Sequence, residues 1–372
     1  MFGAWAKRAA TNHGLRSMPS RMASATRHAS TEATQQSGYR TAYEEALSLI
    51  EVDKKERLKM LERVDKEITR VKKGNTPTQT AQLSALNAVK FDLQVKSELN
   101  DPEIRRNFSN GNLDMERPVY RYLRQKQFEK TPRKQLLQRV SQMNVTPDLL
   151  PLGLVPTVEV NIQLKGQEGP VEPGVFTKPE QVYKEKEKLV GGGINYSIEE
   201  HYNGKMENTT IEVPKVDVTN FHTDKRLYTL LFVDPDSPDV ANKTYQQHCH
   251  WLITNVPLSA TESTVVGGDT VLDYVPPHPQ KGTKYHRYTL IAYEQPNNGS
   301  EKVDIKVDKR EGFDAKSIAA QHNLQPRGVS FFRQVWDETV TSIYNDVLRI
   351  PEPVYGKPPK PQRYIRRAVY IQ

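Results

Sequence analysis

The sequence predicts a mainly β protein, an antiparallel β-sandwich or barrel with few helices, preceded by an α-helical extension. The first observation is a change of period after Pro156, where apolar and polar residues begin to alternate as in a half-buried strand. The second is a series of apolar and β-branched runs punctuated by Pro and Gly, which is typical of successive strands. The third is an earlier helical period over residues 43–71. Many strands followed by one terminal helical segment favour a sandwich or barrel.

Composition limits how much of the chain this domain can include. The chain has 372 residues, of which only 36% are hydrophobic, and its mean hydropathy is −0.71. A core of about 200 residues fits these values better than one globule of the whole length. The formal charge of +8 favours an anionic partner. Cys249 is the only cysteine, which excludes an intrachain disulfide and a cysteine-based metal cluster, and we expect it to be buried and inert.

Residues 1–31 have the composition of a mitochondrial transit peptide. They are rich in Ala, Ser and Thr, and no acidic residue precedes Glu32. The continuous apolar region of a secretory signal is missing. The alternative is a basic arm that stays on the mature protein. Five cations lie in this segment: Lys7, Arg8, Arg16, Arg21 and Arg27.

Residues 32–150 form the predicted helical extension. Apolar residues recur every three or four positions over 43–71, and Gly74 follows two lysines at the end of that helix. A second helix is predicted over 80–99, and a third helical stretch over 115–143, which Pro118 and Pro132 divide. The first helix mixes both charges, which favours contact with protein. Residues 148–156 are predicted to be a stiff linker.

The third helical stretch is the best candidate for RNA contact, because cations that can pair with phosphate alternate with aromatic rings that can stack on bases. The alternative, equally compatible with the pattern, is a solvated helix whose aromatic residues pack on the β domain. The aromatic residues are Tyr120, Tyr122 and Phe128. The candidate cations are Arg117, Arg121, Arg124, Lys126, Arg133 and Lys134.

Residues 151–350 form the predicted β domain. Strands are expected near 158–164, 193–200, 227–233, 249–255, 270–274 and 288–294, with a terminal helical segment near 330–347. Three strand-like runs each have a polar group at one end: Asp234, His250 and His286. No further ligand at tight spacing supports a metal site, so no metal or other cofactor is expected. The motifs of serine hydrolases, nucleotide-binding loops and zinc proteases are absent from the sequence, which favours a protein that is not an enzyme.

These polar groups lie in motifs that resemble the phosphatidylethanolamine-binding protein family. The motifs are Asp-Pro-Asp-Ser-Pro at 234–238, His-Trp-Leu at 250–252 and His-Arg-Tyr at 286–288. The segment 174–182 resembles an early segment of the family, and 331–337 with Tyr344 resembles its C-terminal helix. The resemblance implies a phosphatidylethanolamine-binding-like β-sandwich with an anion pocket. The pocket residues it implies are Asp234, Asp236, His250, His286, Tyr288 and Tyr344.

One loop departs from the family pattern. Where the family has Gly-x-Gly-Pro-Pro, this chain has Pro-Pro-His-Pro-Gln at 276–280, and Lys284 replaces a further glycine. Proline and histidine add bulk where glycine lets the backbone approach an anion. We therefore expect a vestigial pocket, a polar cluster that ties strand ends together, and no small-molecule ligand. The alternative is a working phosphate site at Asp234, His250 and His286.

Residues 351–372 form a basic, Pro-rich tail that cannot form a core and is expected to be extended along RNA or protein. Its candidate contact residues are Lys357, Lys360, Arg363, Arg366 and Arg367.

Together, these segments resemble the ribosomal members of the family. That resemblance implies a structural, non-catalytic constituent of the mitochondrial large ribosomal subunit. It places the chain in the mitochondrial matrix, at the central protuberance, with large-subunit proteins and ribosomal RNA as partners. No apolar run approaches the ~18 residues that a membrane span needs. The alternative is a soluble mitochondrial regulator that binds phospholipid or phosphate.

Overall fold

The computed structural model describes residues 41–73, 79–183 and 213–356. The chain divides into two compact units, 1–49 and 50–372, and the described part of the first unit is the start of helix α1 (Ala42–Lys72). Three predicted features lie outside the described residues: the transit peptide, the strand near 193–200 and the five cations of the tail.

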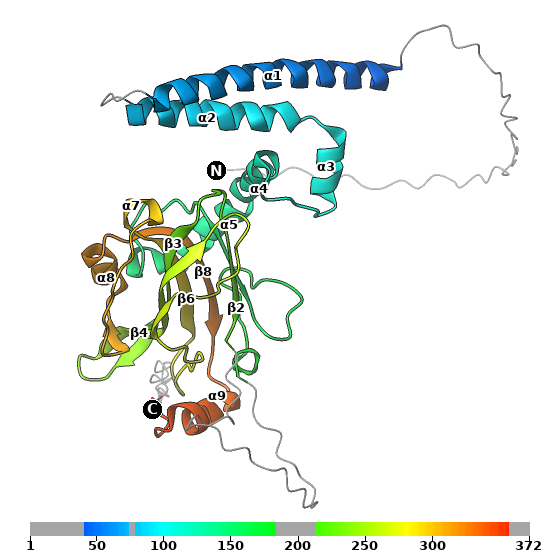
Figure 1. The fold of residues 1–372 in the computed structure, drawn as a ribbon. Coiled ribbons are helices and arrows are strands. Elements are labelled where there is room, and N and C mark those ends of the chain that lie inside the picture. The colour runs from blue at the N-terminus through cyan, green and yellow to red at the C-terminus, as the bar shows by residue number, and fades with distance from the viewer. Residues whose placement is uncertain (1–40, 74–78, 184–212, 357–372) are drawn as a thin grey trace, which may run out of the picture. The chain divides into compact units, whose positions relative to one another are not determined.

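The predicted helices of the extension are confirmed close to the expected bounds. After α1 come α2 (Gln79–Glu98), α4 (Pro118–Lys130) and α5 (Pro132–Gln142). Pro118 and Pro132 each lie in the first turn of their helix, where proline's missing N–H costs nothing and its fixed φ suits the helix. Within the second unit α1 and α2 lie side by side (Figure 1), joined by an ion pair between Lys90 and Asp65 at 2.7 Å.

Two short helices of the extension were not predicted. Helix α3 (Pro102–Ser109) begins after Asp101, whose side chain accepts a hydrogen bond from the Glu103 N–H at 3.0 Å. The predicted second helix ends at residue 99, just before this Asp-Pro pair, and the pair itself starts a new helix. Helix α6 (Val145–Asp148) lies just before the expected linker.

The β domain contains two antiparallel sheets, which confirms the predicted fold class. The larger sheet has the strand order β5-β4-β3-β6-β8, with β7 also paired to β4. The smaller sheet pairs β1 with β2. The strands are β1 (Glu159–Gln163), β2 (Lys215–Thr219), β3 (Arg226–Asp239), β4 (Thr244–Leu258), β5 (Asp269–Leu272), β6 (His286–Glu294), β7 (Glu311–Phe313) and β8 (Gln325–Gln334). Short helical segments occur at η1 (Pro179–Gln181), α7 (Pro296–Gly299) and α8 (Ala315–Gln321).

The predicted terminal helix near 330–347 was wrong over its first residues, which form a strand. Residues 330–334 belong to β8, which pairs with β6 along its length. Helix α9 (Glu338–Ser342) begins after Asp337, whose side chain accepts from the Thr339 N–H, and the π-helical turn η2 (Ile343–Leu348) continues it. Phe331 and Phe332 are both fully buried. A short run that is apolar on both faces has no period to separate strand from helix.

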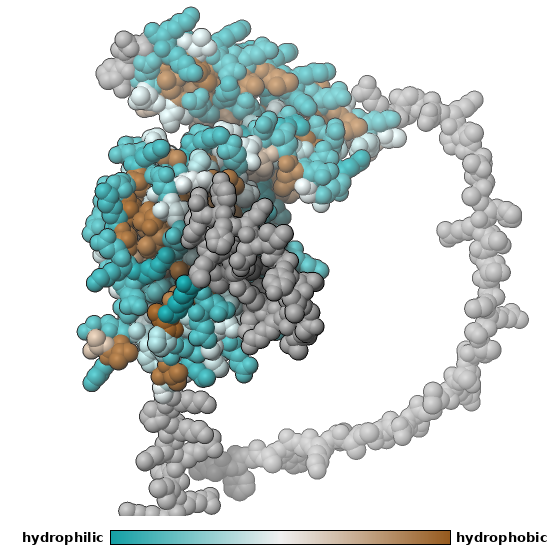
Figure 2. All heavy atoms as spheres, turned by 60° about the horizontal axis from the view of Figure 1, so that its bottom comes forward, coloured by the Kyte–Doolittle hydropathy of each residue, from teal (hydrophilic) through white to brown (hydrophobic). Residues whose placement is uncertain are grey.

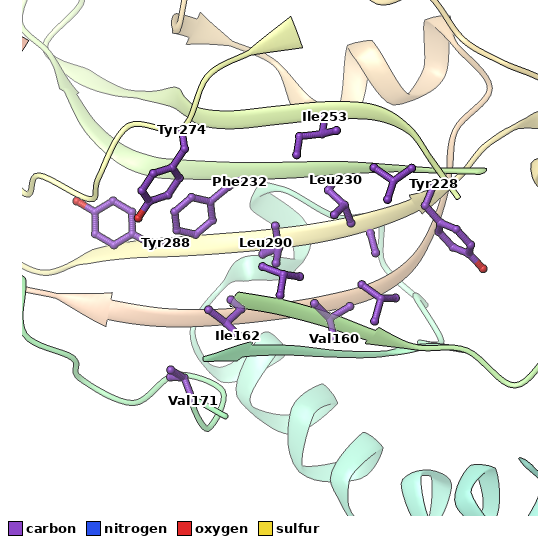
Figure 3. Close-up of a cluster of buried hydrophobic side chains, with 14 of the residues drawn as sticks. Val160, Ile162, Val171, Tyr228, Leu230, Phe232, Ile253, Tyr274, Tyr288 and Leu290 are labelled. Carbon is purple, nitrogen blue, oxygen red and sulfur yellow. The ribbon is translucent and has the colours of Figure 1, made fainter. Parts of the chain in front are cut away.

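Strand β3 explains how the core is built, because its side chains alternate between two clusters. Leu230 and Phe232 point into the cluster between the large sheet and the β1–β2 sheet (Figure 3). Leu231 and Val233 join the cluster on the opposite face, together with Leu149 and other residues of the extension. The extension therefore supplies part of the domain's core. The expected linker 148–156 is accordingly not only a spacer, since Leu149 and Leu150 are buried.

The beginning of the C-terminal tail packs on the β domain. The Tyr355 N–H donates to the Lys281 carbonyl at 2.8 Å, and Val354 forms a parallel bridge with Lys281. Gly282 has a φ of +87°, and a Cβ there would lie 1.9 Å from the Tyr355 carbonyl oxygen. Glycine is therefore required where the two segments cross. The domain continues to residue 356, the last one described.

Candidate functional site

Asp234, at a register shift in β3, and His286, at the start of β6, form a buried ion pair. His286 Nδ1 lies 2.7 Å from Asp234 Oδ2, and both side chains are almost completely inaccessible. His286 Nε2 lies 2.9 Å from the Thr283 hydroxyl. Burial by itself lowers the pKa of His286, but the charge of Asp234 and the hydrogen bond to it raise the pKa above its ordinary value. The pair therefore joins two neighbouring strands, and the contact with Asp234 favours the protonated form of the histidine.

Asp236 and Arg287 form a second ion pair beside the first. Arg287 donates from Nε to Asp236 Oδ2 at 2.8 Å and from Nη2 to Oδ1 at 2.7 Å, a bidentate arrangement. Arg287 Nη1 also donates to the Met143 carbonyl at 2.8 Å and to Asp148 at 2.9 Å. Burial lowers the pKa of Arg287, but Asp236 and Asp148 raise it on balance. This side chain thereby ties the last helices of the extension to the sheet.

Three histidines form a separate buried group. The ring centroids of His248 and His278 each lie 4.9 Å from that of His250, and 5.3 Å from one another. His250 Nδ1 lies 3.0 Å from the Val275 carbonyl and His278 Nδ1 lies 2.8 Å from the Pro276 carbonyl, so each Nδ1 carries the proton. Burial is the main cause that lowers the pKa of all three, that of His248 to about 3. The three imidazoles are therefore neutral at pH 7.

Tyr288 joins the ion pair to the histidine group. Its ring centroid is 6.2 Å from that of His286 and 5.2 Å from that of His250. It is completely buried, its hydroxyl has no hydrogen-bond partner among the described residues, and burial raises its pKa well above the ordinary value. The Tyr344 ring lies 5.4 Å from that of His278. The six residues of the predicted pocket are thus neighbours, with His250 next to other histidines and not directly next to Asp234.

This cluster is closed to solvent. Asp234, His250, His286, Tyr288 and Tyr344 are each at most 2% exposed. The loop 276–280, whose sequence differs from the family pattern, is buried throughout. Its His278 ring occupies space against Tyr344 and His250 at the position of a family glycine. Within residues 41–73, 79–183 and 213–356, no group of three or more His, Cys, Asp or Glu side chains is placed to hold a metal ion.

Three residues of the cluster were missed in the sequence. His278 and Arg287 were noted only as parts of motifs, and His248 was not considered. The loss of a family glycine was the available signal for His278. Arg287 follows His286 in the strand and so points to the opposite face, where its partners come from distant segments. Cys249 is buried with its pKa raised by burial to about 12, in agreement with the expected inert thiol.

The candidate RNA contacts on α4 need one clear correction. Arg121 is only 6% exposed and donates to the backbone carbonyls of Met115 and Glu116 at 2.8 and 2.6 Å, so it is not available to RNA. Arg124 is mostly buried in an ion pair with Glu159 of β1. Tyr120 and Phe128 are buried, which matches the alternative that the aromatic residues pack inward.

The remaining cations of this stretch lie nearer the surface. Arg117 pairs with Glu98 at 2.8 Å, and Lys126 and Arg133 both pair with Glu129. Lys134 is exposed, and no ion pair is found for it among the described residues. Among all the helices that the structure describes, none is long and apolar enough to cross a membrane.

Comparisons with known proteins match the β domain to a protein family. Residues 183–333 match the family model of the phosphatidylethanolamine-binding protein. The chain is 26% identical over 252 residues to large ribosomal subunit protein mL38 of Schizosaccharomyces pombe, covering 68% of this chain and 73% of that protein. It is also 34% identical over 115 residues to a 26 kDa secreted antigen of Toxocara canis, of which it covers 41%.

Two solved structures are also similar. One is carboxypeptidase Y inhibitor in complex with its cognate proteinase, with a TM-score of 0.42 and 19% identity over 55% of this chain and 96% of that one. The other is a phosphatidylethanolamine-binding protein from Plasmodium vivax, with a TM-score of 0.39 and 17% identity over 54% of this chain and 97% of that one. The match of residues 183–333 confirms the resemblance seen in the sequence motifs: this part of the chain carries a phosphatidylethanolamine-binding protein domain.

Proposed function

We propose that this protein is a structural, non-catalytic constituent of the mitochondrial large ribosomal subunit. The observation that carries the proposal is the extent of the similarity to mL38. It covers 252 residues, well beyond the domain matched at residues 183–333. The alignment therefore includes chain outside the family domain, and the relative that shares this additional chain is a large-subunit protein.

The closed cluster supports a role that does not depend on a ligand in the family pocket. A phosphate group would need room and hydrogen-bond donors, but Asp234, His286 and His250 are buried and already bonded within the chain. The neutral histidines offer no positive charge to an anion at pH 7. The burial and bonding of the cluster therefore count against the phospholipid- or phosphate-binding regulator.

Exposed apolar and aromatic side chains outside this cluster support a role in assembly. On α1, Val52, Leu58 and Met60 are 43–53% exposed. On the β domain the Arg333 guanidinium stacks 3.9 Å from the ring centroid of the half-exposed Phe176. Figure 2 shows hydrophobic residues at the surface among hydrophilic ones. Exposed apolar side chains that gather into a patch are typical of sites covered by partners, whereas single ones occur on any surface.

The finer features of the proposal concern location and contacts. Residues 1–31 would act as a transit peptide to the matrix, and the chain would lie in the central protuberance, held by other large-subunit proteins and ribosomal RNA. The tail cations and the outer cations of α4 and α5 would pair with RNA phosphates. The family domain would serve as the rigid body between these contacts.

Depletion of the protein tests the proposal. We expect the mitochondrial large subunit to decrease while the small subunit persists, and organelle protein synthesis to fall in parallel. The quantities are the two ribosomal RNAs on a density gradient and labelling of newly made mitochondrial proteins. Re-expression of the full chain should restore both. A normal large subunit in depleted cells would contradict the proposal.

A further inference from the structure

Residues 302–309 have the side-chain pattern of a strand but no strand partner. Val303 and Ile305 are buried at 9% and 4% exposure, and Val307 is half-buried. Lys302, Asp304, Lys306 and Asp308, which alternate with them, are exposed. This two-residue period is that of an extended strand with one face on the core. Neither β5 nor β4 pairs with it along this stretch.

The segment is fixed to β4 at both ends. At its start the Asn255 side chain pairs with Val303 in both directions, accepting from the Val303 N–H and donating to the Val303 carbonyl, each at 3.0 Å. At its end the Arg310 carbonyl accepts from the Cys249 N–H at 2.9 Å, and the Arg310 guanidinium donates to the Cys249 carbonyl at 3.2 Å. The backbone between these anchors is held extended without a ladder of its own.

Between the anchors, no backbone N–H or carbonyl of residues 304–309 makes a hydrogen bond to any residue that the structure describes. A groove of about 670 Å³ is lined by residues 302–308 together with Asp269, Thr270 and Val271 of β5. Strand β5 ends the order of the large sheet, so in the described part of the chain its outer edge is also unpaired. One groove is therefore lined by two unpaired extended backbones.

We propose that this groove is a site of β-strand addition for an extended segment of another large-subunit protein, an inference that rests on the proposed function. Unpaired N–H and carbonyl groups at strand spacing are complementary to another extended backbone. The outer side chains alternate in charge: Lys302, Asp304, Lys306, Asp308. They match a strand whose charges alternate in the opposite order. A nucleic-acid backbone has no ladder of N–H donors and carbonyl acceptors to pair with these groups, which favours protein over RNA at this groove.

Hydrogen exchange measured by mass spectrometry tests the proposal on the full chain, free and in purified large subunits. The amides of residues 304–309 should exchange rapidly in the free chain and about 100-fold more slowly in the subunit, since a strand ladder protects them. Equal exchange in both states would overturn the proposal. Protection that appears in the free chain with rising concentration would also overturn it, because the occupant would then be a second copy of this chain.

Proline substitutions test the backbone directly. Successive N–H groups of a strand point to opposite edges, so Lys306→Pro and Lys309→Pro each remove a donor from one edge. Lys306→Ala and Lys309→Ala are the matched controls that lose the same side chains. Thermal unfolding of all four should stay close to the parent, since neither N–H is bonded within the described chain.

At least one proline variant should enter the large subunit about tenfold less than its alanine control, the effect of about 1.4 kcal/mol in an equilibrium. If both folded proline variants enter as well as the alanine controls, the groove receives no strand. A chain that is present in the subunit with unprotected amides would overturn this inference alone. Absence of the parent chain from the subunit would overturn the proposed function, and with it the partner named here.

Discussion

Replacing Arg287 by alanine is expected to lower the free energy of unfolding by about 3–5 kcal/mol, the usual loss when one partner of a buried ion pair is removed. Arg287 bonds Asp236 through two nitrogens, with 9% and 20% of the respective side chains exposed. Its bond to Asp148 contributes less, because that carboxylate is 43% exposed. Alanine would leave the Asp236 carboxylate and the Met143 carbonyl without this donor.

Urea unfolding followed by tryptophan fluorescence measures this loss. Lys at position 287 keeps the charge but not the fork-like geometry, so Arg287→Lys should fall between the parent and Arg287→Ala. Arg70→Ala is the surface control, since Arg70 is 82% exposed and pairs with Glu67 only at 3.8 Å; it should change stability by less than about 0.5 kcal/mol. A loss below about 1 kcal/mol for Arg287→Ala would contradict the role of this side chain.

The protein is also expected to lose stability as the pH falls below about 6.5. The pKa values of His248, His250 and His278 are lowered in the folded state. In the unfolded chain these histidines have their ordinary pKa near 6.5, so as the pH falls the unfolded chain takes up protons before the folded one. His248, which stays neutral in the folded state, removes about 2 kcal/mol by pH 5, and His250 and His278 act in the same direction. The loss continues towards the lowered folded pKa, which is about 3 for His248.

His286 contributes with the opposite sign. Its folded pKa is raised, so its stabilising effect is complete below about pH 6.5 and is lost as the pH rises through the folded pKa. It therefore cannot offset the acid loss.

Urea midpoints at pH 7, 6 and 5 test these signs. His278→Asn removes one titrating group while its amide can still donate to the Pro276 carbonyl, so the pH slope should fall by about one proton. Stability that does not change between pH 7 and 5 would show that the three histidines are not neutral together in the folded protein.

The parts of the fold that were predicted are those in which local pattern and tertiary packing agree. The helical repeat of apolar residues, sustained along α1, and the apolar run of β3 each predicted the right type of element. Strand β8 and the segment 148–156 were misjudged because their burial depends on segments far away in sequence. Phe331 and Phe332 lie on opposite faces of a strand buried on both sides, and Leu149 completes a core made mainly by the sheet.

Only those residues of the site that lie in recognisable motifs were predictable from the sequence. Asp234 and His286 were expected to meet, and they lie 2.7 Å apart, because β3 and β6 are neighbours in the sheet. The burial of Arg121 was not predictable from charge, because its guanidinium is satisfied by two carbonyls of the preceding loop, whose geometry the sequence does not reveal. The filling of the pocket by His278 was foreseen as added bulk, but its histidine neighbours were not.

Sedimentation of mitochondrial lysate on a density gradient tests the central claim most directly. The full chain would be followed by antibody, in high magnesium and after magnesium removal has separated the subunits. We predict that the chain moves with the intact ribosome in the first gradient and with the large subunit in the second. A chain that stays at the top of both gradients would contradict the ribosomal role, and binding of phospholipid headgroups would then be the activity to measure.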